Sequence, residues 1–135
     1  IGDIDAAKAY YQQALVVDDE DVTTIILLSS LLLSERQFEE DINLLTQYIA
    51  NDVIDPQFYW DLARANGAIG NEEETEKNWL TAEPYFQENT QFLSDIIAWY
   101  HEQGNQELEI KTMQQYLFLE PDDADMQMRL EDLLF

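Results

Sequence analysis

The sequence has 135 residues, a net charge of -23, 46% hydrophobic residues and no cysteine. This length and apolar content predict one folded domain rather than a disordered tail. The negative charge would repel nucleic acids and anionic membrane surfaces and would attract basic partners. Without cysteine the chain has no disulfides, thiolate metal sites or cysteine nucleophiles, and we expect a cytoplasmic location.

Hydrophobic spacing and turn signals predict eight helices. In chain order they cover residues 3–17, 22–34, 38–50, 56–68, 72–82, 90–102, 106–118 and 124–134. Pro56 is expected at a helix start, and Pro84 is expected to end or kink the helix before it, because an interior proline removes a hydrogen bond and clashes with the preceding turn. The run from Ile25 to Leu33 is also compatible with a buried strand on periodicity alone. The longer apolar stretch from Val22 to Leu33 is too short to span a membrane, which takes about 20 residues.

A constant period favours the helical interpretation. Gly2, Arg36, Gly70 and Gly104 follow one another at equal intervals along the chain. Large apolar residues recur at the same interval, and two such columns are Tyr11, Leu45, Trp79, Met113 and Leu28, Leu62, Ile96, Leu130. A period of this length, about 34 residues, is typical of a solenoid of helix-turn-helix units.

Three stretches carry a resemblance to a known family. They are "GDIDAAKAYYQQAL" at residues 2–15, "YWDLARANGAIGN" at 59–71 and "LEPDDAD" at 119–125, where Pro121 takes the place of the inter-repeat proline. On these residues the whole chain resembles a bacterial-type tetratricopeptide repeat (TPR) array. The resemblance implies an all-α solenoid of antiparallel helix pairs, about eight helices in a right-handed superhelical array.

We expect residues 1–135 to form a single array. Residues 1–21 would be the second helix of a truncated repeat, 22–55, 56–89 and 90–123 would be repeats, and 124–135 would be the terminal helix of a partial or capping repeat. The chain begins without Met inside this pattern, so we expect it to be a piece of a longer protein. Leu15 should pack on the helix that holds Leu28 and Leu32.

The terminal helix has an apolar face of its own, which ends in Leu134 and Phe135. We expect this face either to cap the preceding helix pair or to meet another copy of the chain, which would allow self-association.

The sequence departs from the family pattern at two kinds of position. Arg36 replaces the turn glycine, so we expect the backbone there to avoid a left-handed conformation. The small-residue position five after each marker holds Ala7 but then Asp41, Thr75 and Glu109, so the resemblance does not fix the helix spacing in those pairs.

Candidate catalytic and metal-binding groups are few. His101 is the only histidine, which excludes a two-histidine metal site, and we interpret it as a surface residue. The acidic runs 18–21 and 120–125 lack the glycine and terminal glutamate of a calcium loop, so we interpret them as helix caps and solvated turns. We therefore predict no enzyme activity, no cofactor and no bound metal.

The family resemblance places a partner-binding groove on the first helix of each repeat. By register alone, the residues facing it are Thr23, Ile26, Ser30, Ser34, Gln57, Trp60, Asp61, Arg64, Gln91, Ser94, Asp95, His101 and Glu102. We expect Trp60 to be a large exposed anchor, since rigid aromatic residues are frequent in binding hot spots. Arg64 is the one lysine or arginine expected to face a ligand from these inner helices, with Arg129 possible at the end of the array, so a clamp for an acidic peptide tail is not expected.

These features lead to two hypotheses. The first is a non-catalytic scaffold that binds a basic or amphipathic peptide segment of a partner protein in an acidic concave groove. The alternative is a ligand- or peptide-sensing regulatory module of a larger bacterial regulator.

Overall fold

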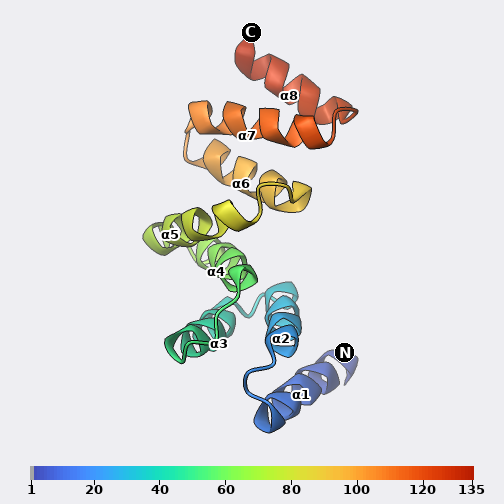
Figure 1. Cartoon of the computed structure of the whole chain (residues 1–135), viewed down its shortest axis with the longest axis vertical. Coiled ribbons are helices and arrows are strands. Elements are labelled where there is room, and N and C mark those ends of the chain that lie inside the picture. The colour runs from blue at the N-terminus through green and yellow to red at the C-terminus, as the bar shows by residue number, and fades with distance from the viewer. Residues whose placement is uncertain (1) are drawn as a thin grey trace. The chain divides into compact units, whose positions relative to one another are not determined.

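The protein is all-helical. The computed structural model describes residues 2–135, which form eight α-helices and one short 3₁₀ helix (Figure 1). The α-helices are α1 (Gly2–Val17), α2 (Val22–Ser34), α3 (Phe38–Ala50), α4 (Pro56–Ala68), α5 (Glu72–Ala82), α6 (Thr90–Glu102), α7 (Gln106–Leu119) and α8 (Ala124–Leu134), and the 3₁₀ helix is η1 (Glu83–Tyr85). The predicted helices are therefore confirmed, with α1 starting one residue earlier and α7 ending one residue later. Ile25 to Leu33 is helical, so the strand interpretation is wrong.

The chain divides into two compact units, one ending at Ala82 and the other running from Glu83 to Phe135. In unit 1 each helix from α1 to α5 packs on the next, and α2 also packs on α4. In unit 2, α7 packs on both α6 and α8. This packing of consecutive helices is typical of helix-turn-helix repeats. The pairs stack on one another because a single short pair cannot bury enough apolar surface alone.

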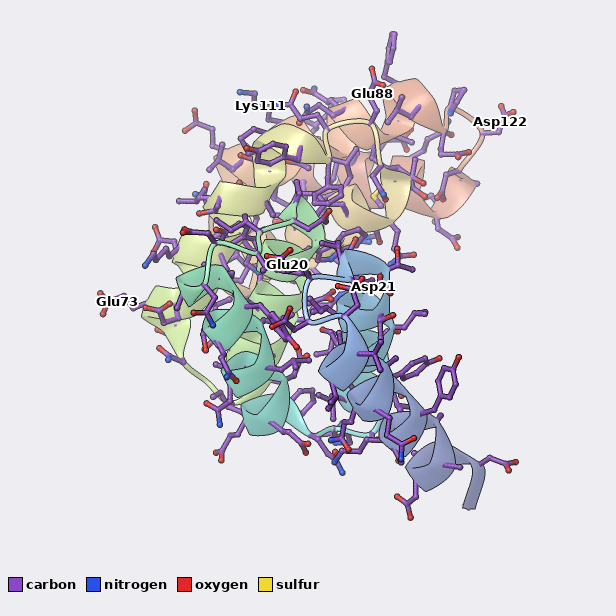
Figure 2. The ribbon with its side chains drawn as sticks, turned by 60° about the horizontal axis from the view of Figure 1, so that its bottom comes forward. Glu20, Asp21, Glu73, Glu88, Lys111 and Asp122 are labelled. Atoms are coloured by element: carbon purple, nitrogen blue, oxygen red, sulfur yellow. The ribbon has the colours of Figure 1, made fainter. Side chains whose placement is uncertain are left out.

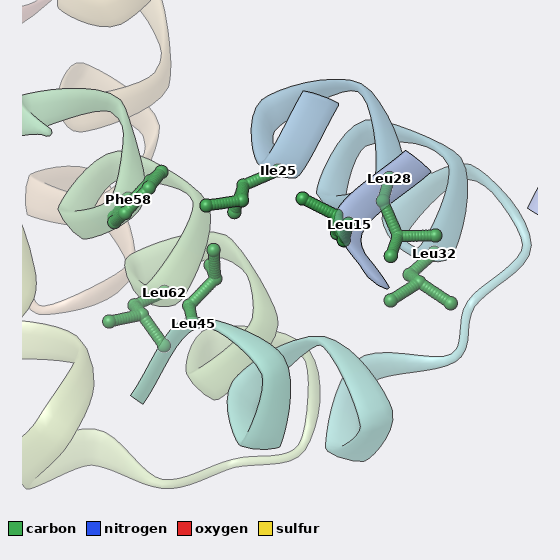
Figure 3. Packing of buried hydrophobic residues seen from close by; sticks show 7 residues of the cluster. All are labelled: Leu15, Ile25, Leu28, Leu32, Leu45, Phe58 and Leu62. Carbon is green, nitrogen blue, oxygen red and sulfur yellow. The ribbon is translucent and has the colours of Figure 1, made fainter. Parts of the chain in front are cut away.

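The core of unit 1 includes residues of the apolar columns that recur once in every repeat, such as Leu28, Leu45 and Leu62. Leu15, Leu28 and Leu32 belong to one buried cluster with Leu45 and Leu62. Figure 3 shows Leu15 of α1 beside Leu28 and Leu32 of α2, as the sequence predicted. Each fully buried side chain of this size contributes about 1.5 to 3 kcal/mol relative to exposure, so the shared columns stabilise the stack.

The core of unit 2 continues onto the terminal helix. Ile97, Met113 and Met126 form a buried cluster, and Leu130 and Leu133 of α8 pack against it. The apolar face of α8 therefore caps the α6–α7 pair, which was one of the two predicted outcomes. Phe135 is 100% exposed, and self-association through this helix stays a prediction.

The turns leading into four helices carry the expected caps. Asp21, Asp55, Asn89 and Asp123 occupy the same position in successive repeats, and the side chain of each accepts a hydrogen bond from a backbone N–H in the first turn of the helix that follows. The acidic runs therefore do cap α2 and α8. Proline also acts as predicted, because Pro56 lies in the first turn of α4. The helix before Pro84 ends at Ala82 and gives way to η1.

The prediction for Arg36 is wrong. Its φ is +59°, in the same left-handed region as Gly70 at +81° and Gly104 at +70°. The hydrogen bonds that close the turn explain this conformation. The backbone N–H of Gln37 donates to Leu32 O at 2.8 Å, and the N–H groups that follow the two glycines donate to the equivalent carbonyls of the next two repeats. Closing a helix end in this way needs one residue in the left-handed conformation. In the turn between α2 and α3 that residue is Arg36.

Among the described residues, no helix combines the length and apolar character needed to cross a membrane.

Candidate partner-binding surface

In unit 1 the predicted groove residues lie on α2 and α4, which pack against each other. On α2, Thr23, Ser30 and Ser34 are exposed, and Ile26 is half-buried. On α4, Arg64 is exposed and Gln57 is half-buried. The accessible part of this surface is therefore rich in hydroxyl and amide groups.

Trp60 does not have the exposure that the sequence suggested. Its side chain is 5% exposed, so the prediction of a large exposed anchor is wrong. The reason is the central place of α4, which packs on α2, α3 and α5 and buries seven of its thirteen residues. The Arg64 guanidinium lies over the Trp60 ring at 4.7 Å from its centroid, in cation–π geometry.

Asp61 is buried as well, and its carboxylate is used inside the protein. The Ser29 hydroxyl of α2 donates to Oδ2 at 2.9 Å, and the Gln57 amide donates to Oδ1 at 2.9 Å. Burial raises the pKa of Asp61, and these two hydrogen bonds and the charge of Arg64 lower it in part. Asp61 therefore joins α2 to α4 instead of offering a charge to a partner.

In unit 2 the predicted residues lie on α6. The Gln91 amide donates to Asp95 Oδ1 at 3.0 Å, which reproduces the Gln57–Asp61 pair in the next repeat. Ser94 and Asp95 are half-buried, and Gln91, His101 and Glu102 are exposed. His101 Nδ1 lies 3.0 Å from Glu109 Oε2, so His101 is the partner of a buried acid. That the α6 residues belong to one groove with those of α2 and α4 stays a prediction.

Acidic side chains border the unit 1 surface at its turns. Residues 18–21 are all acidic and lead into α2, while Asp52 and Asp55 lie in the turn that leads into α4. Figure 2 shows Glu20 and Asp21 on the turn between α1 and α2. Lys8, one of the few basic residues, forms an ion pair with Glu40 at 2.9 Å. Helix α2 has no acidic residue and the acid of α4, Asp61, is buried, so the negative charge that borders this surface lies in the turns before α2 and α4.

The sequence interpretation did not identify Asp41 as a buried acid. It stands on α3, is 0% exposed, and neither of its carboxylate oxygens has a hydrogen-bond partner among the described residues. The signal was available, because the repeat register puts Asp41, Thr75 and Glu109 where small residues normally separate two helices. All three side chains are buried.

Two cavities lie on other faces of unit 1. One has a volume of about 230 Å³ and includes Leu28, Leu32 and Leu44 in its lining, and the other has about 390 Å³ and includes Leu62, Asn66 and Asn78. The second set of residues stands one repeat after the first, so the cavities are repeat equivalents with different polarity. Neither is lined by a predicted groove residue.

The acidic runs do not gather into a metal-binding cluster in the part of the chain that the structure describes. No three His, Cys, Asp or Glu side chains come together there in a way that could hold a metal ion.

Comparison with known proteins identifies the repeat. Residues 56–123 match a family model described as YpiA-like, C-terminal tetratricopeptide repeats. Two crystal structures of MamA share the fold, with TM-scores of 0.79 and 0.80 at 17% identity. Each comparison covers 98% of this chain, and 72% and 77% of the two MamA chains. At this identity the likeness to MamA concerns the fold alone. No curated protein matches the chain.

Proposed function

Since the chain belongs to the family of YpiA-like C-terminal tetratricopeptide repeats, we propose that it is a non-catalytic module that binds a basic or amphipathic segment of a partner protein. Repeats of this kind are generally protein-interaction modules, and their stacked helices present extended binding surfaces. The fold is typically non-catalytic, and the proposal assigns no cofactor. The cytoplasmic location stays a prediction from the sequence.

The observation that carries the proposal is the position of the acidic turns. The chain has a net charge of -23, and two acidic turns lie immediately before the helices that start a repeat in unit 1. Residues 18–21 precede α2, and Asp52 and Asp55 precede α4. A field of this sign raises the association rate of a basic segment and opposes an acidic one.

The exposed faces of α2 and α4 that follow these turns supply a different kind of contact. Thr23, Ser30 and Ser34 of α2 are exposed hydroxyl groups, and Ile26 and Gln57 are partly accessible. Such side chains can bond the backbone or polar groups of an incoming segment, and their apolar atoms can pack on its stem. We propose that this surface sets affinity through short-range contacts, whereas the acidic turns set the association rate.

The proposal is tested by measuring the binding of a lysine- and arginine-rich peptide and of an acidic peptide of equal length. We expect binding of the basic peptide only, with a dissociation constant that rises at least about tenfold between 50 and 500 mM salt, because exposed charges are screened. Tight binding of the acidic peptide that does not respond to salt would reject the proposal.

A matched pair of variants locates the binding surface. Ser30→Arg places a bulky cation on the exposed face of α2, and Gln47→Arg places the same cation on an exposed position of α3. We expect Ser30→Arg to weaken basic-peptide binding about tenfold and Gln47→Arg to weaken it about twofold, through long-range charge alone. Equal effects of the two variants would place the partner elsewhere.

A further inference from the structure

Unit 1 buries two carboxyl groups around one hydroxyl group. Asp41 of α3 is fully buried, and Asp61 of α4 is 3% exposed. Ser29 of α2, which is also fully buried, lies near both carboxyl groups. Its hydroxyl proton is donated to Asp61 Oδ2, at an oxygen–oxygen distance of 2.9 Å.

The two carboxyl groups differ in their hydrogen bonds and in the charge beside them. Asp61 accepts from both Ser29 and Gln57 and has the positive charge of Arg64 on its own helix. Asp41 accepts no hydrogen bond from the described residues. A buried carboxylate without donors is costly, and the cost rises when a second carboxylate lies nearby.

In the described part of the chain, the helices packed around Asp41 bring it no compensating charge. No residue of α2 between Val22 and Ser34 is ionisable. Helix α4 carries Asp61 and Arg64, and the charge that acts on Asp41 is the negative one of Asp61. The neighbour of Asp41 on α3, Glu40, is paired with Lys8 of α1 at 2.9 Å.

We infer that Asp41 holds a proton in native unit 1 up to near-neutral pH. The site where α2, α3 and α4 pack together therefore binds a proton. A protonated carboxyl is a donor, and Ser29 Oγ keeps a lone pair while it donates to Asp61. Protonation therefore permits a chain in which Asp41 donates to Ser29 and Ser29 donates to Asp61. Loss of the proton leaves two carboxylates facing one hydroxyl group. The inference does not depend on which partner the module binds.

The electrostatics of the site agree with this geometry. Burial is the main reason why the pKa of Asp41 is raised from 3.8 to about 7; the nearby Ser29 hydroxyl opposes this rise, and the negative charge of Asp61 adds to it.

The direction of the pH effect follows from the raised pKa. Between pH 3.8 and about 7 the native state holds a proton that the unfolded state has released. Raising the pH through this window therefore destabilises unit 1, and well above pH 7 the loss is complete. This pH dependence is opposite in sign to that of a carboxylate whose native pKa is depressed, which adds stability as the pH rises.

The test compares urea unfolding of the whole chain and of Asp41→Asn at pH 5.5, 6.5, 7.5 and 8.5. Backbone amide resonances of α2, α3 and α4 report unit 1 separately. The ratio of the unfolding constants, wild type over Asp41→Asn, should rise up to about tenfold per pH unit between pH 5.5 and 6.5 and level off above pH 7.5. Taking the ratio cancels the titrating groups that do not interact with Asp41.

Two further variants complete the design. Glu39→Gln removes an exposed acid from the same helix and should keep the pH dependence of the wild type. Asp41→Ala places in α3 the residue that occupies this repeat position in α1, Ala7, and provides a second titration-free variant if Asp41→Asn does not fold. A ratio that stays constant from pH 5.5 to 8.5 against either Asp41 variant would overturn the inference.

Discussion

Asp41 in unit 1 and Glu109 in unit 2 occupy the same position of the repeat, two repeats apart, and both are buried, at 0% and 4% exposure. Glu109 reaches His101 of α6, with Oε2 3.0 Å from Nδ1. Asp41 has no such partner among the described residues. One backbone position between two helices therefore accepts a buried acid in two ways, by pairing it with a basic group or, as we infer, by keeping it protonated.

Thr75 shows a third solution in the intervening repeat. Its hydroxyl donates to the Asn71 carbonyl at 2.7 Å, one turn earlier in the chain. A short polar side chain is thus satisfied within its own helix and needs nothing from the neighbouring one. A polar residue is therefore tolerated in place of a small one when its polar group is hydrogen-bonded, ion-paired or, as we infer for Asp41, protonated.

The largest expected effect concerns the apolar column shared by the two units. Leu45 and Met113 are both fully buried at equivalent positions. Replacing either with Ala should lower the free energy of unfolding of its own unit by about 2 to 5 kcal/mol, through lost burial and a residual cavity. Urea unfolding followed by NMR resonances of each unit measures this. A loss below about 1 kcal/mol at either site would mean that the column is not the core of that unit.

A smaller effect is expected when Glu109 loses its partner. His101→Ala should destabilise unit 2 by about 1 kcal/mol at pH 7, because a buried carboxylate is left without its basic group. The effect is moderate because the His101 side chain is 68% exposed. Glu109→Gln in the His101→Ala background removes the unpaired charge and should recover most of the loss in thermal unfolding. If His101→Ala and the double variant are equally destabilised, the pair does not act as described.

Effects of this size and smaller are expected at the left-handed turn residues. Gly70→Ala should cost about 1 kcal/mol, and all of it should be backbone strain, because a Cβ at Gly70 would meet nothing within 4 Å. Arg36→Gly should stabilise the protein by about 0.5 kcal/mol, because glycine adopts the left-handed conformation without strain. The gain is smaller than the cost of Gly70→Ala because the contact of Arg36 with the Phe38 ring is lost. Chemical denaturation measures both. A stabilising Gly70→Ala would contradict the strain assigned to this turn.

Much of the fold could be predicted from the sequence because the constant repeat period fixes which helix faces meet. Leu15, Leu28 and Leu32 could be placed together from the sequence alone, and each predicted helix agrees within one residue at its ends. Arg36 was misjudged because propensity alone disfavours a left-handed arginine, whereas the closing hydrogen bond of Gln37 demands that conformation.

The candidate surface was less predictable. Register gives the side of a helix on which a residue stands, but burial depends on how many neighbours that helix has. Trp60 and Asp61 lie on α4, which packs on three other helices, so both are buried despite their predicted place on the groove side. Asp41 was noticed as a departure from a small residue, and its burial and missing donors required the packed structure.

The titration of Asp41 in the native protein tests the central claim most directly. Selective ¹³C labelling of aspartate side chains allows the carboxyl resonance of Asp41 to be followed from pH 4.5 to 8.5, with Asp41→Asn identifying the signal. We predict a midpoint near pH 7, in line with the pKa to which burial raises this group. A midpoint below about pH 5 would show that Asp41 is ionised in the folded protein and would contradict the account.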